Sequence, residues 1–407
     1  PEGPYIYGSG VTFIKKAPRH FRYADMFAGI GGFRQIMDRM GGTCIKSCEI
    51  DPEAAAVYED NYGDNPLGDI KELHGSDIKG ADVLCGGFPC QGFSVGGKKL
   101  GFADERGTLF FQLARLLREC ISDGYPVRYI VFENVKNLLS HDCGNTWATV
   151  RETLTDMGYA LCDPIIVNPV QFGIPQNRPR LLILGEYMPA HRPHAAAGLP
   201  RSQCGNVFGT GFFEEGPDEY FAKYALSRYQ SDTLRMWDEF KRGIGELPIA
   251  VNQKYFRYTD AETAAVENPD ERKVARRSAE CFRANSGFIT EWEKRWDNLE
   301  WVNPSHRRFE WQAGRNYGSV YECFAQFRQS GLRIKKPDFF PCLVAIVQTS
   351  IVPKFGRKLT PRECARLQTF PDSFRLAEKD RFAYKQLGNS ICIEAVGYYA
   401  SRFVTFD

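Results

Sequence analysis

A cysteine framed by a proline and by glycines is the residue of this chain best suited to nucleophilic chemistry. Cys90 stands in the stretch GGFPCQGFS at residues 86–94, directly after an apolar run at 81–85 that predicts a buried strand. Pro89 fixes its own backbone angle and biases Phe88 toward extended geometry, so the thiol is held in a fixed direction. A lone cysteine is usually a small buried hydrophobic residue, but a buried structural thiol needs no such frame. The sequence therefore favours a nucleophile at position 90.

Two more groups of reactive side chains follow predicted strands. Glu133 comes directly after a buried strand, where a dry environment raises the pKa of a carboxyl group enough for it to donate a proton. The alternative is a partly exposed glutamate on a turn. Gln176, Arg178 and Arg180 alternate, so in a strand they share one face, and two guanidinium groups there attract phosphate or a planar acceptor. The alternative for this group is a solvated sheet edge.

A glycine turn with an acidic partner suggests a nucleoside site. Gly29 and Gly31 permit a tight turn after the first predicted strand, and Glu49 lies twenty residues on, where a carboxylate can accept hydrogen bonds from ribose hydroxyls. Arg34 stands where a dinucleotide fingerprint has its third glycine, so a ligand without phosphates is favoured. A glycine turn beside an unrelated surface glutamate explains the pair equally well.

The elements that position these residues alternate between strand and helix. Helices are expected at 33–40 and from about 109 to 124, after Thr360 with its capping box, and after 388–390. Apolar runs predict strands at 21–27, 43–50, 83–85, 129–132 and 181–184. This order predicts an α/β fold with a doubly wound, mainly parallel sheet. Ligands bind beyond the carboxyl ends of such strands, where all the groups above would lie.

The motifs together resemble the DNA (cytosine-5) methyltransferase family, in the order that family has them. They are DMFAGIGG at 25–32, Glu49, GDI at 68–70, GFPCQGFS at 87–94, GTLF at 107–110, ENV at 133–135, QNRPR at 176–180, LTPRECARLQ at 359–368 and QLGNSI at 386–391. The resemblance implies S-adenosylmethionine as cofactor, S-adenosylhomocysteine as product and no metal. It also implies a Rossmann-like catalytic domain and double-stranded DNA as partner.

The resemblance also assigns roles to residues. Cys90 would be the nucleophile, Glu133 would contact the N3 edge of cytosine, and Arg178 and Arg180 would steady the base or its phosphates. The cofactor site would comprise Phe27, Gly29, Gly31, Glu49, Ile50, Asp69, Ile70, Pro89, Leu109, Asn389 and Ile391. DNA contacts would come from a basic, glycine-rich loop after the nucleophile and from one further glutamine; the residues are Gln91, Ser94, Lys98, Lys99, Arg106 and Gln176.

The cytosine ring explains these residue types independently. Carbon 5 is a poor nucleophile until a thiolate adds to carbon 6 and a proton is given to N3. The base must also leave the duplex before this addition, at a cost of roughly a few kcal/mol. Two alternatives share the family, namely a tRNA cytosine-5 methyltransferase and a non-catalytic DNA-binding member. A Rossmann oxidoreductase is a third.

The domain organisation follows from where the motifs stop. We expect a catalytic domain at 20–190 that is completed by 375–407, and a smaller target-recognition domain at 191–374 that includes the helix at 360–368. The net charge of the 407 residues is only +2, so any DNA-binding surface must be local. Thirteen cysteines without regular spacing, no secretory signal and no long apolar run predict a cytoplasmic protein without a membrane partner. The modest size and the lack of appended regulatory domains suggest a bacterial or phage modification enzyme, which we expect to be nucleoid-associated. We expect a monomer, with a cognate restriction endonuclease as genetic partner.

Overall fold

The chain divides into two compact units, each with its own sheet. The computed structural model describes residues 12–89, 109–188, 204–345 and 349–406. The first unit comprises Pro1–Gly205, Pro341–Val347 and Pro361–Asp407. The second comprises Asn206–Phe340 and Gln348–Thr360.

The boundary of the second unit differs from the expected one. The sequence places 191–374 in a second domain together with the helix at 360–368, whereas helix α10 (Pro361–Leu367) belongs to the first unit. This helix packs against α11 (Asp380–Asn389), and the side chain of Gln368 donates hydrogen bonds to carbonyls at the end of α11 and just beyond it. Its C-terminal neighbours therefore hold α10 in the first unit, a contact that local helix signals cannot reveal.

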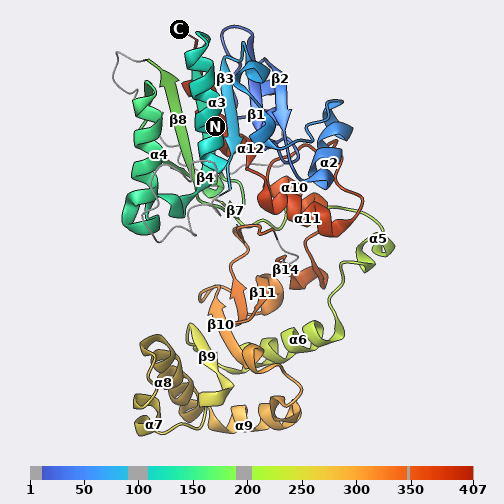
Figure 1. The fold of residues 1–407 in the computed structure, drawn as a ribbon. Helices are drawn as coiled ribbons and strands as arrows, with labels where there is room; N and C mark the ends of the chain where they lie inside the picture. The colour runs from blue at the N-terminus through green and yellow to red at the C-terminus, as the bar shows by residue number, and fades with distance from the viewer. Residues whose placement is uncertain (1–11, 90–108, 189–203, 346–348, 407) are drawn as a thin grey trace. The chain divides into compact units, whose positions relative to one another are not determined.

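A seven-stranded sheet forms the centre of the first unit (Figure 1). Its strands are β1 (Phe21–Met26), β2 (Gly42–Cys48), β3 (Val83–Gly87), β4 (Tyr129–Val135), β5 (Tyr159–Leu161), β6 (Ile165–Val167) and β8 (Arg180–Tyr187). The order is β2-β1-β3-β4-β8-β5, with β6 also paired to β8. The first four strands pair in parallel, and β8 runs antiparallel to its neighbours. The carboxyl ends of β1 to β4 therefore meet at one edge.

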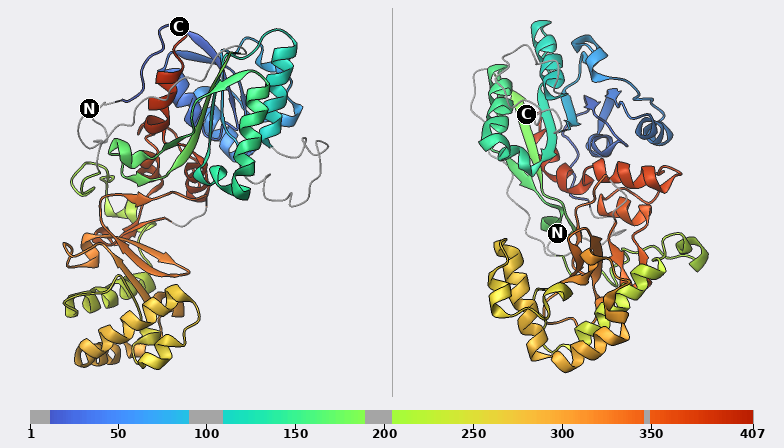
Figure 2. Two further views of the ribbon diagram at one scale, coloured as in Figure 1. Left: turned by 90° about the vertical axis from the view of Figure 1, so that its left-hand side faces the viewer. Right: turned by 60° about the horizontal axis from the view of Figure 1, so that its bottom comes forward.

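Helices cover both faces of this sheet (Figure 2). Helices α3 (Leu109–Ser122) and α4 (Asn145–Asp156) pack over one face, while α1 (Gly32–Arg39) and α12 (Ile393–Phe403) pack together over the other. A further helix, α2 (Pro52–Tyr62), follows β2. The prediction of a doubly wound α/β fold is confirmed.

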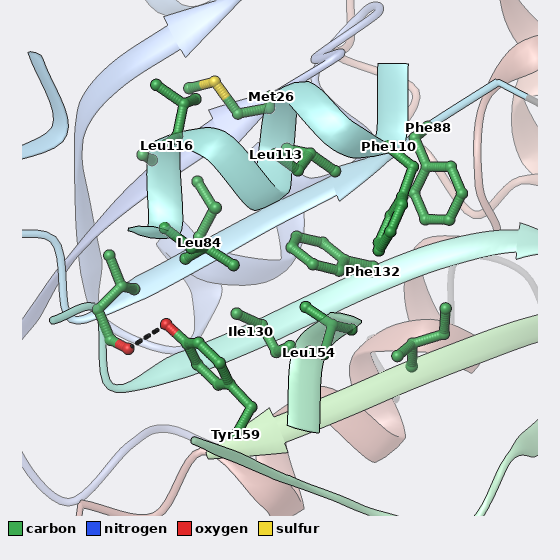
Figure 3. Packing of buried hydrophobic residues seen from close by; sticks show 14 of the residues in the cluster. Met26, Leu84, Phe88, Phe110, Leu113, Leu116, Ile130, Phe132, Leu154 and Tyr159 are labelled. Atoms are coloured by element: carbon green, nitrogen blue, oxygen red, sulfur yellow. Dashed lines mark hydrogen bonds between the residues drawn. The ribbon is translucent and has the colours of Figure 1, made fainter. Parts of the chain in front are cut away.

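The face under α3 and α4 carries a large apolar core (Figure 3). Leu84 of β3 and Phe132 of β4 are buried with Leu113 of α3. Tyr159 belongs to the same core, and its hydroxyl donates a hydrogen bond of 2.8 Å to the carbonyl of Val127. Each large apolar side chain buried here stabilises the fold by about 1.5–3 kcal/mol. The core thus fixes the ends of β3 and β4, which carry the reactive groups.

The second unit is built on a six-stranded sheet with its own aromatic core. Its strands are β9 (Ala250–Asn252), β10 (Arg308–Gln312), β11 (Phe324–Arg328), β12 (Gly331–Lys335), β14 (Ile351–Val352) and β15 (Arg357–Lys358), and its helices are α5 (Asp218–Ala222), α6 (Arg228–Gly243), α7 (Asp260–Ala264), α8 (Pro269–Ala284) and α9 (Ser286–Arg295). Trp237 of α6 stacks on Phe309 of β10 with ring centroids 4.7 Å apart. Trp292 of α9 packs against Trp237 in a tilted arrangement, with ring centroids 5.4 Å apart. Within the described ranges, no helix of either unit combines the length and apolar character needed to cross a bilayer.

Candidate active site

Strands β3 and β4 bring Glu133 next to the residues that precede Cys90 in the chain. The two strands pair in parallel with Gly87 opposite Glu133. A Cβ atom at Gly87 would lie 3.3 Å from Oε2 of Glu133, so the glycine leaves room for the carboxyl group. The side-chain amide of Asn134 donates a hydrogen bond of 2.9 Å to the carbonyl of Phe88. The strand that carries the carboxyl group is thereby tied to the strand that leads toward the nucleophile.

Burial dominates the electrostatics of Glu133. The residue is 8% exposed, and this burial raises its pKa above the ordinary carboxyl value, although Arg180 and Arg178 act in the opposite direction. Nε of Arg180 lies 3.0 Å from Oε1 of Glu133, yet this oxygen has no hydrogen-bond partner among the described residues. A carboxyl group with a raised pKa keeps its proton nearer to neutral pH, so Glu133 is suited to donate a proton to a ring nitrogen.

Arg178 binds backbone carbonyls and has little exposed surface. Only 3% of the residue is exposed. Its Nη2 atom donates hydrogen bonds to the carbonyls of Gly388 and Ser390 at 2.8 and 2.6 Å. Its Nη1 atom donates to the carbonyl of Leu343 at 2.8 Å. The guanidinium group therefore fixes the segment that begins at residue 341 to the turn after α11, and Arg180 alone of the two arginines pairs with the catalytic candidate Glu133.

Gln176 has no exposed surface, which corrects the expectation that it contacts DNA. Its side-chain amide donates a hydrogen bond of 2.7 Å to the carbonyl of Leu367 and lies 3.2 Å from Oε1 of Gln368. It belongs to the short strand β7 (Gln176–Asn177), whereas Arg180 begins β8. The three residues of this motif therefore do not share the face of one strand, because β7 ends at Asn177, before Arg178.

The glycine turn after β1 and Glu49 form a second cluster of predicted site residues. Gly29 and Gly31 have φ angles of 54° and 89°, in the left-handed region that favours glycine. The preceding residue, Phe27, also has a positive φ of 56°, which is uncommon for a residue with a side chain. The Glu49 carboxylate accepts hydrogen bonds of 2.8 Å from the backbone N–H groups of Gly29 and Asp51. The turn and the acid are thus joined by a hydrogen bond.

Two exposed apolar residues neighbour Glu49, one next to it in the sequence and one across a backbone bridge. Ile50 is 68% exposed and Leu67 is 55% exposed. Glu49 forms an isolated β-bridge with Leu67, so the backbones of these two residues lie side by side. Asp69 accepts a hydrogen bond of 3.0 Å from Lys71 and caps the short helix that begins at the buried Ile70. An exposed apolar surface beside a carboxylate suits a ligand with a flat ring and a ribose. Sequence reasoning named Ile50 and Asp69 for this site but did not name Leu67.

Residues distant in sequence hold the glycine turn in place. The hydroxyl of Tyr62 donates a hydrogen bond of 3.0 Å to the carbonyl of Gly31 and accepts one of 2.9 Å from Gln35. A Cβ atom at Gly32 would lie 2.8 Å from Cγ1 of Ile391, so the predicted C-terminal cofactor residue packs on the turn. Tyr62 was missed because an aromatic residue at a helix end carries no functional signal in one sequence.

The remaining predicted residues divide into those that the structure places and those it does not describe. Leu109 packs against the same core as Phe27. Pro89 and Asn389 are exposed. The nucleophile and the basic loop lie outside the described residues, namely Cys90, Gln91, Ser94, Lys98, Lys99 and Arg106. Among the described residues no three histidine, cysteine or acidic side chains gather as a metal-binding group.

Comparison with known proteins decides the family. Residues 21–404 match the family model described as C-5 cytosine-specific DNA methylase. The chain belongs to this family. It is 31% identical to the type II methyltransferase M.HhaI of Haemophilus parahaemolyticus, over 93% of each chain. It is 33% identical to the type II methyltransferase M.HpaII of Haemophilus parainfluenzae, over 92% of this chain and 87% of that protein. The protein is therefore a DNA (cytosine-5)-methyltransferase.

Solved structures support the fold of this DNA methyltransferase. The Dnmt2 methyltransferase of S. pombe superposes with a TM-score of 0.53 at 17% identity, over 95% of this chain and 98% of that chain. The Entamoeba histolytica methyltransferase EhMeth gives a TM-score of 0.53 at 14% identity, with the same coverage of 95% and 98%. At these identities the likeness shows a shared fold.

Proposed function

We propose that this methyltransferase acts at a specific DNA sequence, as a type II enzyme, on a cytosine flipped out of the duplex. The reaction would proceed through a covalent adduct between Cys90 and carbon 6 of the ring. The observation that carries the proposal is the buried Glu133, with its raised pKa, beside the strand that leads to Cys90. Double-stranded DNA is the proposed partner, and a monomer in a bacterial cytoplasm, paired genetically with an endonuclease, is the proposed setting.

Each catalytic residue has a separate task in this mechanism. The Cys90 thiolate adds to carbon 6 while Glu133 donates its proton to N3, so the ring becomes an enamine with a nucleophilic carbon 5. Arg180 holds the Glu133 carboxyl group from one side. After methyl transfer, carbon 5 loses its proton to solvent, the Cys90 thiolate is eliminated from carbon 6, and N3 returns its proton to the Glu133 carboxylate, which restores the aromatic ring. Arg178 positions the backbone around the site and takes no part in the chemistry.

The cluster around the glycine turn fits S-adenosylmethionine. When bound, this molecule supplies the methyl group that carbon 5 receives. Glu49 keeps free lone pairs on both carboxylate oxygens for the ribose hydroxyls, while its two backbone donors fix its direction. Ile50 and Leu67 offer an apolar surface to the adenine ring. A side chain at Gly31 would overlap the Tyr62 ring. Glycine at this position therefore keeps the turn in a shape whose backbone a ligand can approach closely.

Bisulfite sequencing tests this function. Plasmid DNA from cells that express the wild-type protein should carry 5-methylcytosine at one recurring short sequence. DNA from cells that express Cys90→Ser should carry none, although the purified variant still binds S-adenosylmethionine, because Cys90 is assigned only to the addition step. Methylation by Cys90→Ser at the wild-type level, or methyl incorporation into tRNA with none into duplex DNA, would overturn the proposal.

A further inference from the structure

The strand register of the second unit gathers arginines on one face of its sheet. In the neighbouring strands β10, β12 and β11, Glu310 lies opposite Arg333, and Arg333 lies opposite Gln326. Side chains alternate between the two faces of a strand, so Arg308 and Arg328 share the face of Glu310. The other face carries the buried residues of the aromatic core. This sheet therefore has one apolar face and one basic face.

We call Arg308, Arg328 and Arg333 around Glu310 the arginine cluster. Glu310 is 7% exposed. Nε of Arg333 lies 2.7 Å from Oε2 of Glu310, Nε of Arg308 lies 3.3 Å from Oε1, and Nη1 of Arg328 lies 4.0 Å from Oε2. The three arginine side chains are 26%, 25% and 34% exposed, in the same order. The carboxylate is thus enclosed, whereas each arginine side chain keeps a quarter to a third of its surface exposed.

The arginine cluster has more donors than the protein satisfies. Nε of Arg308 and Nη1 of Arg328 are buried atoms without a hydrogen-bond partner among the described residues. Helix α8 contributes one further carboxylate, that of Glu271, which lies 2.6 Å from Arg308. Lys335 adds a fourth cation to the basic face, and the carboxylate of Asp338 lies near it. Within the described part of the chain, the three arginines and Lys335 therefore face the three carboxylates of Glu310, Glu271 and Asp338. A buried donor without an acceptor costs about 1–3 kcal/mol, so stability alone does not explain this arrangement.

We propose that the arginine cluster binds a backbone phosphate of the DNA substrate. A phosphodiester is a compact anion with several acceptor oxygens, which suits the excess positive charge of these partly exposed arginine side chains. Glu310 aligns the guanidinium groups before DNA arrives, so little side-chain entropy is lost on binding. This inference rests on the proposed action on duplex DNA and adds the residues by which the second unit holds the duplex without regard to sequence.

Arg328 is the best residue for the test because, among the described residues, its guanidinium group has the longest ion pair of the arginine cluster. Arg328→Gln removes the charge, and the ion pair of Arg328 with Glu310, its one ion pair within the described ranges, is already long at 4.0 Å. Binding to a short labelled duplex of mixed sequence is measured by fluorescence anisotropy over a range of salt concentrations. Loss of one phosphate contact makes the slope of log affinity against log salt less steep by about 0.9. When salt is raised fourfold, from about 50 to 200 mM, the variant should therefore lose about 3.5-fold less affinity than the wild-type protein loses.

Two further variants separate charge from structure. Arg328→Lys keeps the charge and should keep the wild-type slope. Arg276→Gln removes an exposed arginine of α8, whose side chain is 64% exposed, and should also leave the slope unchanged. Thermal melting confirms that each variant is folded. An Arg328→Gln slope equal to that of wild type, or an equal loss in Arg276→Gln, would overturn the phosphate site. Methylation of plasmid by the wild-type enzyme tests the proposed function separately, since binding here is read without turnover.

Discussion

Replacement of Glu133 by glutamine tests the proposed proton donor most sharply. Glutamine keeps the size of the side chain and can still hydrogen-bond N3, but it cannot deliver a proton there. General acid catalysis contributes a factor of about 10²–10⁴ to rates. At about 1.36 kcal/mol per tenfold, Glu133→Gln should raise the barrier by about 2.7–5.4 kcal/mol. Single-turnover methyl transfer from labelled S-adenosylmethionine to duplex DNA measures this loss directly.

The pKa of Glu133 gives the same experiment a pH dependence. Burial raises the pKa of this carboxyl group in the folded enzyme. The folded state therefore holds the proton over a range of pH in which the unfolded chain has lost it. In that range both the proton needed for addition and some of the folding stability are lost as pH rises. Glu133→Gln should lack this contribution to both profiles.

Glu186 provides a matched control on the neighbouring strand. It is 6% exposed and pairs with Arg128 at 2.8 Å, while its strand β8 runs antiparallel to β4, so that Glu186 faces the start of β4. Glu186→Gln removes a buried carboxylate of similar environment from the opposite end of the sheet and should leave the single-turnover rate near that of wild type. Equal rates in wild type and Glu133→Gln, or equal losses in the two variants, would refute the reasoning.

Two further predictions concern the glycine turn and the strand before it. Gly31→Ala should weaken S-adenosylmethionine binding in calorimetry by more than Gly41→Ala, because a Cβ at Gly31 would lie 2.3 Å from the Tyr62 ring, whereas Gly41, with a similar φ of 94°, has open space. Equal affinities would show that the turn does not hold the cofactor. Burial raises the pKa of Asp25 to about 8, so wild-type stability should fall as pH rises from about 4 to about 8, by up to about 1.36 kcal/mol per pH unit. Asp25→Asn should flatten this dependence in urea unfolding, and an unchanged profile would contradict the assignment.

Local patterns predicted the elements that carry the active site. The apolar run at 21–27 is strand β1 (Phe21–Met26), and the glycines after it form the turn that their spacing predicts. Thr360 and Pro361 mark the start of α10 correctly. These features depend on neighbouring residues only, which is why the sequence reveals them.

Features that depend on distant partners could not be predicted in this way. Gln176 looks like an exposed polar residue, but its partner is the carbonyl of Leu367, which lies far along the chain. The same holds for Arg178, whose acceptors near residues 343 and 388–390 join it only when the chain has folded. Tyr62 meets Gly31 through the packing of α2 on the turn. A pattern of residue types cannot show such contacts.

Trapping of the reaction intermediate tests the central claim most directly. Duplex DNA that carries 5-fluorocytosine at the methylated position is incubated with the enzyme and S-adenosylmethionine, and the products are digested and examined by mass spectrometry. The fluorine blocks the final elimination, so the account predicts a stable adduct in which the peptide containing Cys90 is bonded to the methylated base. Methyl transfer to DNA without any adduct, or an adduct on a different cysteine, would contradict it.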